Sequence, residues 1–216
     1  RMAALCEIQW SGADKKNYEC FLSRLPQLTN LYDVKGYNYA THAFDITGRL
    51  VPNTEEEALE VTFTTIDNCP IYYTLDGTEP TAAASTKYEG PLKLKESCVI
   101  KAKGIRATGE TRIFTEEIKL HKASFKPITM LQPINPQYKF EGAGVLLDGL
   151  KGNFNYKTGR WIAFYKNDLE AIIDMKEPTE ISSVGISALV EKGDWVFGPR
   201  KFTVAISEDG KNFKEI

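Results

Sequence analysis

The sequence is poor in the residues that most often bind metals or act as catalytic bases. Its 216 residues include two histidines, His42 and His121, which lie far apart and beside no cluster of cysteines or carboxylates. A histidine-containing zinc site or a Ser-His-Asp triad needs histidines next to other ligating or reacting groups. The scarcity of histidine therefore excludes both kinds of site.

Cysteine is scarce as well. Cys6, Cys20, Cys69 and Cys98 form no CxxC pair and show no metal-ligand spacing. The first two lie on apolar faces of expected helices, and the other two lie just before expected strands. We therefore predict free, buried thiols that pack as small apolar groups, in preference to a disulfide framework.

Neither a charge excess nor a long apolar run is present. The 27 lysines and arginines nearly balance the 29 aspartates and glutamates, and both signs are mixed along the chain. A nucleic-acid-binding protein usually shows a basic excess or stripe, so we predict no nucleic-acid partner. No apolar run approaches the length that crosses a bilayer, so we predict no membrane-spanning segment. No signal peptide is visible, but the sequence opens at Arg1 within a helical pattern, so this says nothing about targeting.

The first of three zones, residues 1–41, is predicted to be helical. Pro26 falls inside the pattern and predicts a break or a kink, and Gly36 is a natural C-terminal cap. Two short helices with one apolar face cannot form a domain alone. We therefore expect them to pack on the zone that follows, on a second copy of the chain or on a missing partner, with Leu25 and Leu28 mostly buried. The apolar stripe recurs every three or four residues: Tyr18, Phe21, Leu22, Leu25, Leu28, Leu31 and Tyr32.

The second zone, about residues 43–122, changes to a period of two. Leu59, Val61 and Phe63 alternate with polar residues, and the alternation of residues 114–120 has one charged exception, Glu116. Short alternating strands separated by tight turns predict a compact antiparallel β-sandwich. The turn-forming pairs are Asp67-Asn68, Asp76-Gly77, Gly90-Pro91 and Thr108-Gly109.

The third zone follows a connector that contains Pro127, Pro133 and Pro136, a composition typical of a semi-rigid linker. A jelly roll needs about eight strands, and only four or five can be counted here. The zone is therefore expected to be an incomplete jelly roll, or one completed by strands from elsewhere. Strands are predicted at Leu169–Met175, Ile181–Leu189 and Arg200–Ser207, and Ser207–Lys211 is predicted to form a hairpin turn.

The run Ile71–Thr81, IYYTLDGTEPT, is the most distinctive motif, and it has a strand closed by an Asp-Gly turn. It resembles the YTLDGSEPT signature of a small fibronectin-like sandwich appended to bacterial β-N-acetylhexosaminidases. Residues 1–10 and 18–39 resemble the end of a glycoside hydrolase family 20 catalytic barrel, whose segment PRMAALAEVQW matches RMAALCEIQW. The last zone resembles the start of a discoidin-like, factor 5/8 type C module, on the segments Leu147–Gly149, Gly159–Trp161, Leu169–Asp174 and Trp195–Ser207.

These resemblances imply a mainly β fold with a helical N-terminal piece. Residues 1–42 would be the last helices of the barrel, 43–124 a fibronectin- or immunoglobulin-like sandwich, and 125–216 a C-terminally incomplete discoidin-like jelly roll. The implied parent is a secreted bacterial hexosaminidase of Bacteroides type, located in the periplasm, on the outer surface or outside the cell. It would hydrolyse terminal N-acetyl-hexosamine residues with help from the substrate's own acetamido group.

The catalytic Asp-Glu pair of that family is absent, because the sequence contains no Asp-Glu dipeptide. This segment alone is therefore expected to be inactive, with the upstream barrel of the same polypeptide as its partner. Glu7 and Trp10 could form a sugar subsite, but their spacing of three favours helix packing. No cofactor is required, although the Asp148-Gly149 turn lies where discoidin-like modules hold a structural calcium.

Arg160, Trp161 and Trp195 are the candidate carbohydrate-binding residues, for a glycan ending in N-acetyl-hexosamine or a galactose-type sugar. Aromatic rings stack on the apolar face of a pyranose, and arginine binds its hydroxyls. Both tryptophans could instead anchor the core of the sandwich. Three functions stay open: a non-catalytic hexosaminidase region, a stand-alone carbohydrate-binding module, and a structural or adhesive sandwich pair.

Overall fold

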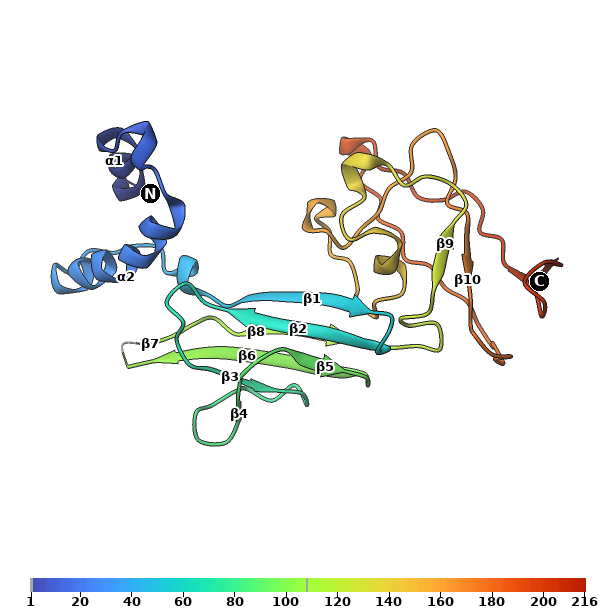
Figure 1. The fold of residues 1–216 in the computed structure, drawn as a ribbon, viewed down its shortest axis with the longest axis horizontal. Helices are drawn as coiled ribbons and strands as arrows, with labels where there is room; N and C mark the ends of the chain where they lie inside the picture. Colours follow the sequence, from blue (N-terminus) through green and yellow to red (C-terminus); the bar gives the residue numbers. More distant parts are fainter. Residues whose placement is uncertain (1, 108) are drawn as a thin grey trace.

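The structure is a computed structural model that describes residues 2–107 and 109–216. It is mainly β, with a helical N-terminal piece followed by a β-sandwich and a third, largely irregular zone (Figure 1). The helices lie at one end of the sandwich and the third zone lies at the other. Within the described ranges, no helix combines the length and the apolar character that crossing a bilayer requires.

The helical piece consists of α1 (Met2–Trp10) and α2 (Tyr18–Val34). The Asn17 side chain caps α2 by accepting a hydrogen bond from the Cys20 N–H at 2.8 Å. Gly36 adopts a φ of 66°, and the Tyr37 N–H bonds the Tyr32 carbonyl at 2.9 Å, which confirms the predicted glycine cap. Of the two alternatives predicted at Pro26, the break is wrong, because α2 continues through this residue.

The helices do not pack on the sandwich, which was one of the surfaces expected to cover them. They extend from the end of the sandwich instead of lying on one of its faces (Figure 1). Arg106 fixes that exit, since its guanidinium donates to the Phe44 carbonyl at 2.8 Å just before the first strand. Leu25 and Leu28 are consequently only half-buried, and Cys6 and Cys20 are exposed. The four cysteines are free as predicted, but none is fully buried, since Cys69 and Cys98 are only half-buried.

Two antiparallel sheets form the sandwich. The first contains β1 (Thr47–Asn53), β2 (Ala58–Thr64) and β5 (Leu92–Leu94). The second contains β3 (Ile71–Thr74), β4 (Thr86–Lys87), β6 (Cys98–Arg106), β7 (Gly109–Glu110) and β8 (Phe114–Ile118). Strand β2 is central in the first sheet, with Val61 opposite Leu50 of β1 and Leu92 of β5.

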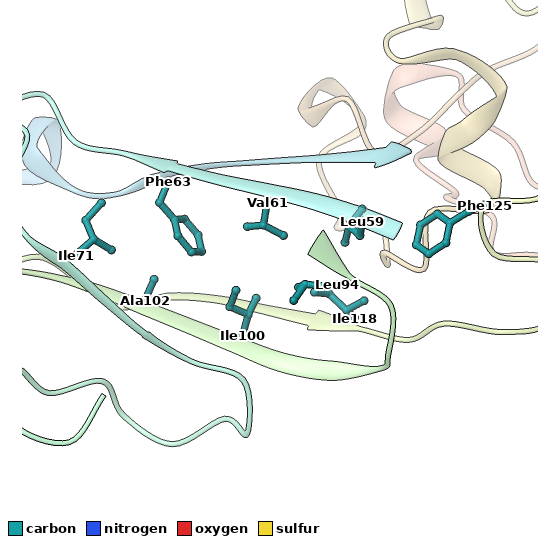
Figure 2. Packing of buried hydrophobic residues seen from close by; sticks show 9 residues of the cluster. All are labelled: Leu59, Val61, Phe63, Ile71, Leu94, Ile100, Ala102, Ile118 and Phe125. Atoms are coloured by element: carbon teal, nitrogen blue, oxygen red, sulfur yellow. The ribbon is translucent and has the colours of Figure 1, made fainter. Parts of the chain in front are cut away.

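The core lies between the sheets, as Figure 2 shows. Leu59, Val61 and Phe63 point inward from β2 and meet Ile100 and Ala102 of β6, which confirms the predicted alternation. Each fully buried aliphatic side chain contributes about 1.5–3 kcal/mol. The core also contains Ile71, Leu94, Ile118 and Phe125.

The turn of the distinctive motif follows β3. Gly77 has a φ of 78°, which a residue with a side chain adopts only with strain. The Asp76 carboxylate accepts hydrogen bonds from the Thr78 N–H at 3.0 Å and from the Thr78 hydroxyl at 2.6 Å. The predicted Asp-Gly turn is therefore confirmed. Of the pair Thr108-Gly109, Thr108 lies outside the described residues.

In the third zone, β9 (Ile128–Met130) pairs with β10 (Ala171–Ile173), and β11 (Ala205–Ile206) pairs with β12 (Lys214–Glu215). The hairpin turn after residue 207 is confirmed, since the Asp209 carboxylate accepts from the Lys211 and Asn212 N–H groups. The strand predicted at 181–189 is not formed. Its apolar residues Ile181, Val184 and Ile186 are exposed, so no second layer covers them.

The interpretation of the three prolines as a linker is also wrong. The Pro127 carbonyl accepts from the Asp174 N–H at 3.0 Å, and the Pro133 carbonyl accepts from the Asn167 side chain at 2.9 Å. Pro136 begins a short 3-10 helix, Pro136–Tyr138. These contacts integrate the segment into the third zone, because proline leaves its carbonyl free to accept.

Candidate functional site

Arg160 forms a bidentate ion pair with Glu116 of β8. Its two terminal nitrogens donate to the two carboxylate oxygens at 3.0 and 2.8 Å. The side chains are only 22% and 19% exposed, respectively. The pair explains why a charged residue, Glu116, stands at an inward position of β8. Its carboxylate is neutralised by Arg160, which comes from the third zone. The guanidinium is thereby engaged with protein, which favours a structural role for Arg160.

Trp161 is half-buried, and its indole N–H donates to the Asn153 carbonyl at 2.7 Å. The ring lies directly against Gly152, where any side chain would collide with it. This arrangement corresponds to the packing role that the sequence left open for Trp161. Its indole N–H and the ring atoms around it are therefore in contact with the protein.

Trp195 is 82% exposed at the tip of a short hairpin. Glu191 and Val196 exchange two backbone hydrogen bonds of 3.0 Å, and the turn Lys192–Asp194 lies between them. The φ of Trp195 is 61°, in the left-handed region that bulky residues rarely adopt. A backbone outlier of this kind is often found at functional loops. The alternative that Trp195 fills the core does not describe this structure.

Phe197 accompanies Trp195 on the surface. The ring centroids are 6.4 Å apart with the planes at 82°, an edge-to-face pair, and Phe197 is 63% exposed. We call Trp195 and Phe197 the aromatic pair. Sequence reasoning missed Phe197 as a candidate, because the left-handed turn at Trp195 that brings the two rings together is not visible in the local pattern.

The hairpin is attached to a neighbouring turn, Tyr156–Thr158. The Tyr156 hydroxyl donates to the Asp194 carboxylate at 2.8 Å, and this hydrogen bond is the main reason why the pKa of Tyr156 is raised. Tyr138 packs edge-on against Tyr156 with centroids 5.7 Å apart. The aromatic pair therefore has a carboxylate beside it and a supported loop below it. Such a surface can stack an apolar ligand face and hydrogen-bond polar groups at its rim.

Asp148 is buried, with 5% of its surface exposed. One carboxylate oxygen accepts the Leu150 N–H at 2.8 Å. Burial raises the pKa of Asp148 to about 6, partly opposed by the Leu150 N–H and by the charge of Arg160. Among the described residues, no group of three or more His, Cys, Asp or Glu side chains could hold a metal ion. A calcium ion at Asp148 would thus depend on backbone carbonyls, and it stays a prediction.

The facing sides of α1 and α2 form an open groove of about 330 Å³. Glu7 spans it by pairing with Arg24, whose hydrogen bond lowers the pKa of Glu7. This pairing supports the packing interpretation of Glu7 over a sugar subsite. Trp10, in contrast, is 90% exposed at the rim of the groove. The groove is lined by Ala3, Cys6, Glu7, Trp10, Phe21, Arg24, Leu25 and Leu28.

Part of the chain is similar to known proteins. Residues 59–118, from β2 to β8, match the family described as Fn3 associated. A stretch of 113 residues, 51% of the chain, is 32% identical to a beta-hexosaminidase of Porphyromonas gingivalis (strain ATCC BAA-308 / W83). The match spans 14% of the length of that relative. The chain therefore contains a hexosaminidase-related region with an Fn3-associated sandwich, which fits a non-catalytic accessory region.

Proposed function

We propose that this chain is a non-catalytic C-terminal region of a secreted bacterial β-N-acetylhexosaminidase of glycoside hydrolase family 20. In this proposal residues 1–42 complete the catalytic barrel, the sandwich of residues 43–124 braces it, and residues 125–216 belong to a discoidin-like domain. The parent would act on terminal N-acetyl-hexosamine residues in the periplasm, on the outer surface or outside the cell. Two findings support this assignment: residues 59–118 match the Fn3-associated family, and a stretch of 113 residues of the chain is 32% identical to a beta-hexosaminidase.

The observation that carries the proposal is the uncovered apolar surface of the helical piece. Thr29 is the one buried residue among the described residues of α1 and α2. An isolated surface of this kind costs solvation free energy, about 1.5–3 kcal/mol for each large apolar side chain that is left in water. A partner that covers both helices therefore stabilises them. The exposed apolar residues are Met2, Leu5, Ile8, Trp10, Tyr18, Leu31, Val34 and Tyr37.

Hydrolysis of an aryl N-acetyl-β-glucosaminide tests the assignment. We expect no turnover by the purified 216-residue chain and measurable turnover by a longer polypeptide that includes the upstream barrel. Turnover by the short chain, with contaminating enzyme excluded, would disprove the proposal.

A substitution in α2 of the longer polypeptide tests the contact itself. Leu28→Asp places a charge in the groove and should lower the thermal midpoint of the barrel. Gln27→Asp, on the exposed side of the same helix, is the matched control and should leave it unchanged. Equal midpoints for the two variants would mean that the groove is not the contact surface.

Carbohydrate binding is the second candidate, and the aromatic pair supports it. Trp195 offers an open indole face, and the nearby Asp194 carboxylate offers a hydrogen-bond acceptor. The proposed ligand is a glycan ending in N-acetyl-hexosamine or a galactose-type sugar. Arg160 and Trp161 would then support the site through their protein contacts, and Asp148 would hold the calcium that the resemblance implies.

Titration calorimetry with the free monosaccharides and short glycans tests this candidate. Trp195→Ala should abolish any binding that the native chain shows, because the stacking face is lost. Phe154→Ala is the matched control, since Phe154 is a 95% exposed aromatic residue of the same zone that lies outside the hairpin. Equal loss in both variants, or binding that survives Trp195→Ala, would contradict the assignment.

A further inference from the structure

The backbone of the third zone joins the edge of the sandwich directly. The Lys119 N–H donates to the Gly149 carbonyl at 2.8 Å, and the Phe125 N–H donates to the Leu147 carbonyl at 3.0 Å. Ile118 and Leu150 face each other in an antiparallel bridge. We call this contact of residues 147–150 with residues 118–125 the seam.

The apolar core also crosses the seam. Phe125 is 3% exposed and belongs to the core cluster of the sandwich, and Leu150 packs against that cluster. Figure 2 places Phe125 at the end of the core, beside Leu59 and Ile118. Leu147, which bonds to the Phe125 backbone, is 5% exposed. Separating the third zone from the sandwich would therefore uncover apolar surface on both sides.

Ion pairs fasten the same junction from outside. Glu57, in the turn between β1 and β2, accepts hydrogen bonds from Lys126 at 2.9 Å and from Lys176 at 2.8 Å. Lys126 is 17% exposed, so its charge is largely removed from water. The two lysines lower the pKa of Glu57 to about 2. With Arg160 and Glu116, these pairs connect the sandwich to three separate segments of the third zone.

We propose that the seam joins the sandwich and the third zone into one rigid unit. This unit holds the Trp195 hairpin in a fixed position. The path of contacts is continuous. Glu116 pairs with Arg160, which follows the turn Tyr156–Thr158 in the chain. Tyr156 of that turn donates a hydrogen bond to Asp194, the residue before Trp195. The hairpin therefore keeps one orientation relative to the sandwich, whether or not its ligand is a sugar.

Gly149 is the position on which the seam depends. Its φ is 74°, and a Cβ there would lie 2.5 Å from the Leu120 Cδ2 and 3.1 Å from the Lys119 carbonyl oxygen. Gly142 has a similar φ of 83° but nothing within 4 Å of its Cβ position. Substituting alanine at either position brings the same kind of backbone strain, and only the substitution at Gly149 forces the seam apart.

Hydrogen exchange followed by mass spectrometry tests the seam on the 216-residue chain. Gly149→Ala should raise exchange in residues 116–125 and 141–150 on the order of tenfold over Gly142→Ala. Residues 58–64 of β2 should keep their protection. Equal exchange in the two variants would overturn the proposal.

Two further pairs keep the test decisive if Gly149→Ala fails to fold. Glu57→Gln should raise exchange in residues 126–130 and 171–176 by about two- to fivefold. Glu56→Gln should leave this exchange unchanged, because Glu56 pairs with Lys93, a residue of the sandwich itself. Tyr156→Phe should raise exchange in residues 191–197, while Tyr165→Phe, at a 69% exposed tyrosine, should leave it unchanged. Unchanged exchange in both Glu57→Gln and Tyr156→Phe would refute the rigid unit, and neither result depends on glycan binding.

Discussion

The ion pair of Arg160 with Glu116 distinguishes a structural arginine from a sugar-binding one. Replacing Arg160 by methionine leaves the Glu116 carboxylate without its partner in a site that is 19% exposed. Breaking a fully buried pair costs about 3–5 kcal/mol, and the residual solvent contact here reduces the cost to about 2–3 kcal/mol. For a chain of this length, that loss lowers the thermal midpoint by roughly 4–12 °C.

A double-mutant cycle isolates the pair from the other contacts of each residue. Arg160→Met and Glu116→Leu should each be destabilising, and the double variant should be more stable than either, because an apolar pair needs no charge compensation. Equilibrium unfolding in urea at pH 7, followed by far-UV circular dichroism, gives the free energies of unfolding. Single variants that unfold like the native protein would refute the reasoning. The guanidinium of Arg160 would then have no structural role that prevents it from binding a ligand.

The control is another arginine–glutamate pair of the same chain that is exposed to solvent. Arg49 and Glu141 also join the sandwich to the third zone, but they are 4.0 Å apart and 72% and 55% exposed. Surface pairs of this kind contribute about 0–1 kcal/mol. Arg49→Met should therefore change the free energy of unfolding by less than the variants of the buried pair. Equal losses at both positions would mean that the cost comes from general loss of charge.

Three further variants test other parts of the structure. Ile100→Ala empties a fully buried position and should cost about 2–5 kcal/mol of unfolding free energy, as measured in urea. Trp195→Ala removes an exposed ring and should change the thermal midpoint little, so a large loss would contradict its surface position. The pKa of Asp148 is raised from 3.8 to about 6, so the folded state binds its proton more tightly than the unfolded state. Stability in the presence of a chelator should therefore be full below about pH 4 and fall by up to about 3 kcal/mol as the pH rises through about 6. Asp148→Asn should remove this fall, and a native chain whose thermal midpoint is level from pH 4 to pH 7 would contradict it.

Much of the sandwich can be predicted from local pattern, because a period of two assigns alternate residues to the core wherever a second sheet lies above. Leu59, Val61 and Phe63 are buried for this reason. The Asp76-Gly77 turn is equally local, since its hydrogen bonds join residues two positions apart. The helices and their glycine cap also follow from spacing alone.

Prediction of the candidate site was poorer, because its geometry depends on partners that are distant in the sequence. Nothing in the local pattern around Arg160 indicates a bond to Glu116, which lies 44 residues earlier. Trp161 and Trp195 each follow a short polar, glycine-containing stretch and precede apolar residues, yet Trp195 is exposed at a hairpin tip and Trp161 is half-buried. Exposure depends on which segments cover a ring, and a sequence pattern does not specify those segments.

The classes of element follow from the amino-acid pattern: helices first, then short alternating strands closed by Asp-Gly and Gly-Pro turns. The folded chain was needed to see that the prolines after residue 126 lie in an attached zone and that residues 181–189 stay outside a sheet. The same holds for the ion pair of Glu57 with Lys176, which lies 119 residues away in the sequence. The physical reason is the range of the interactions. Turn and propensity effects act within a few residues, whereas pairing between strands and between charges depends on how the whole chain brings distant segments together.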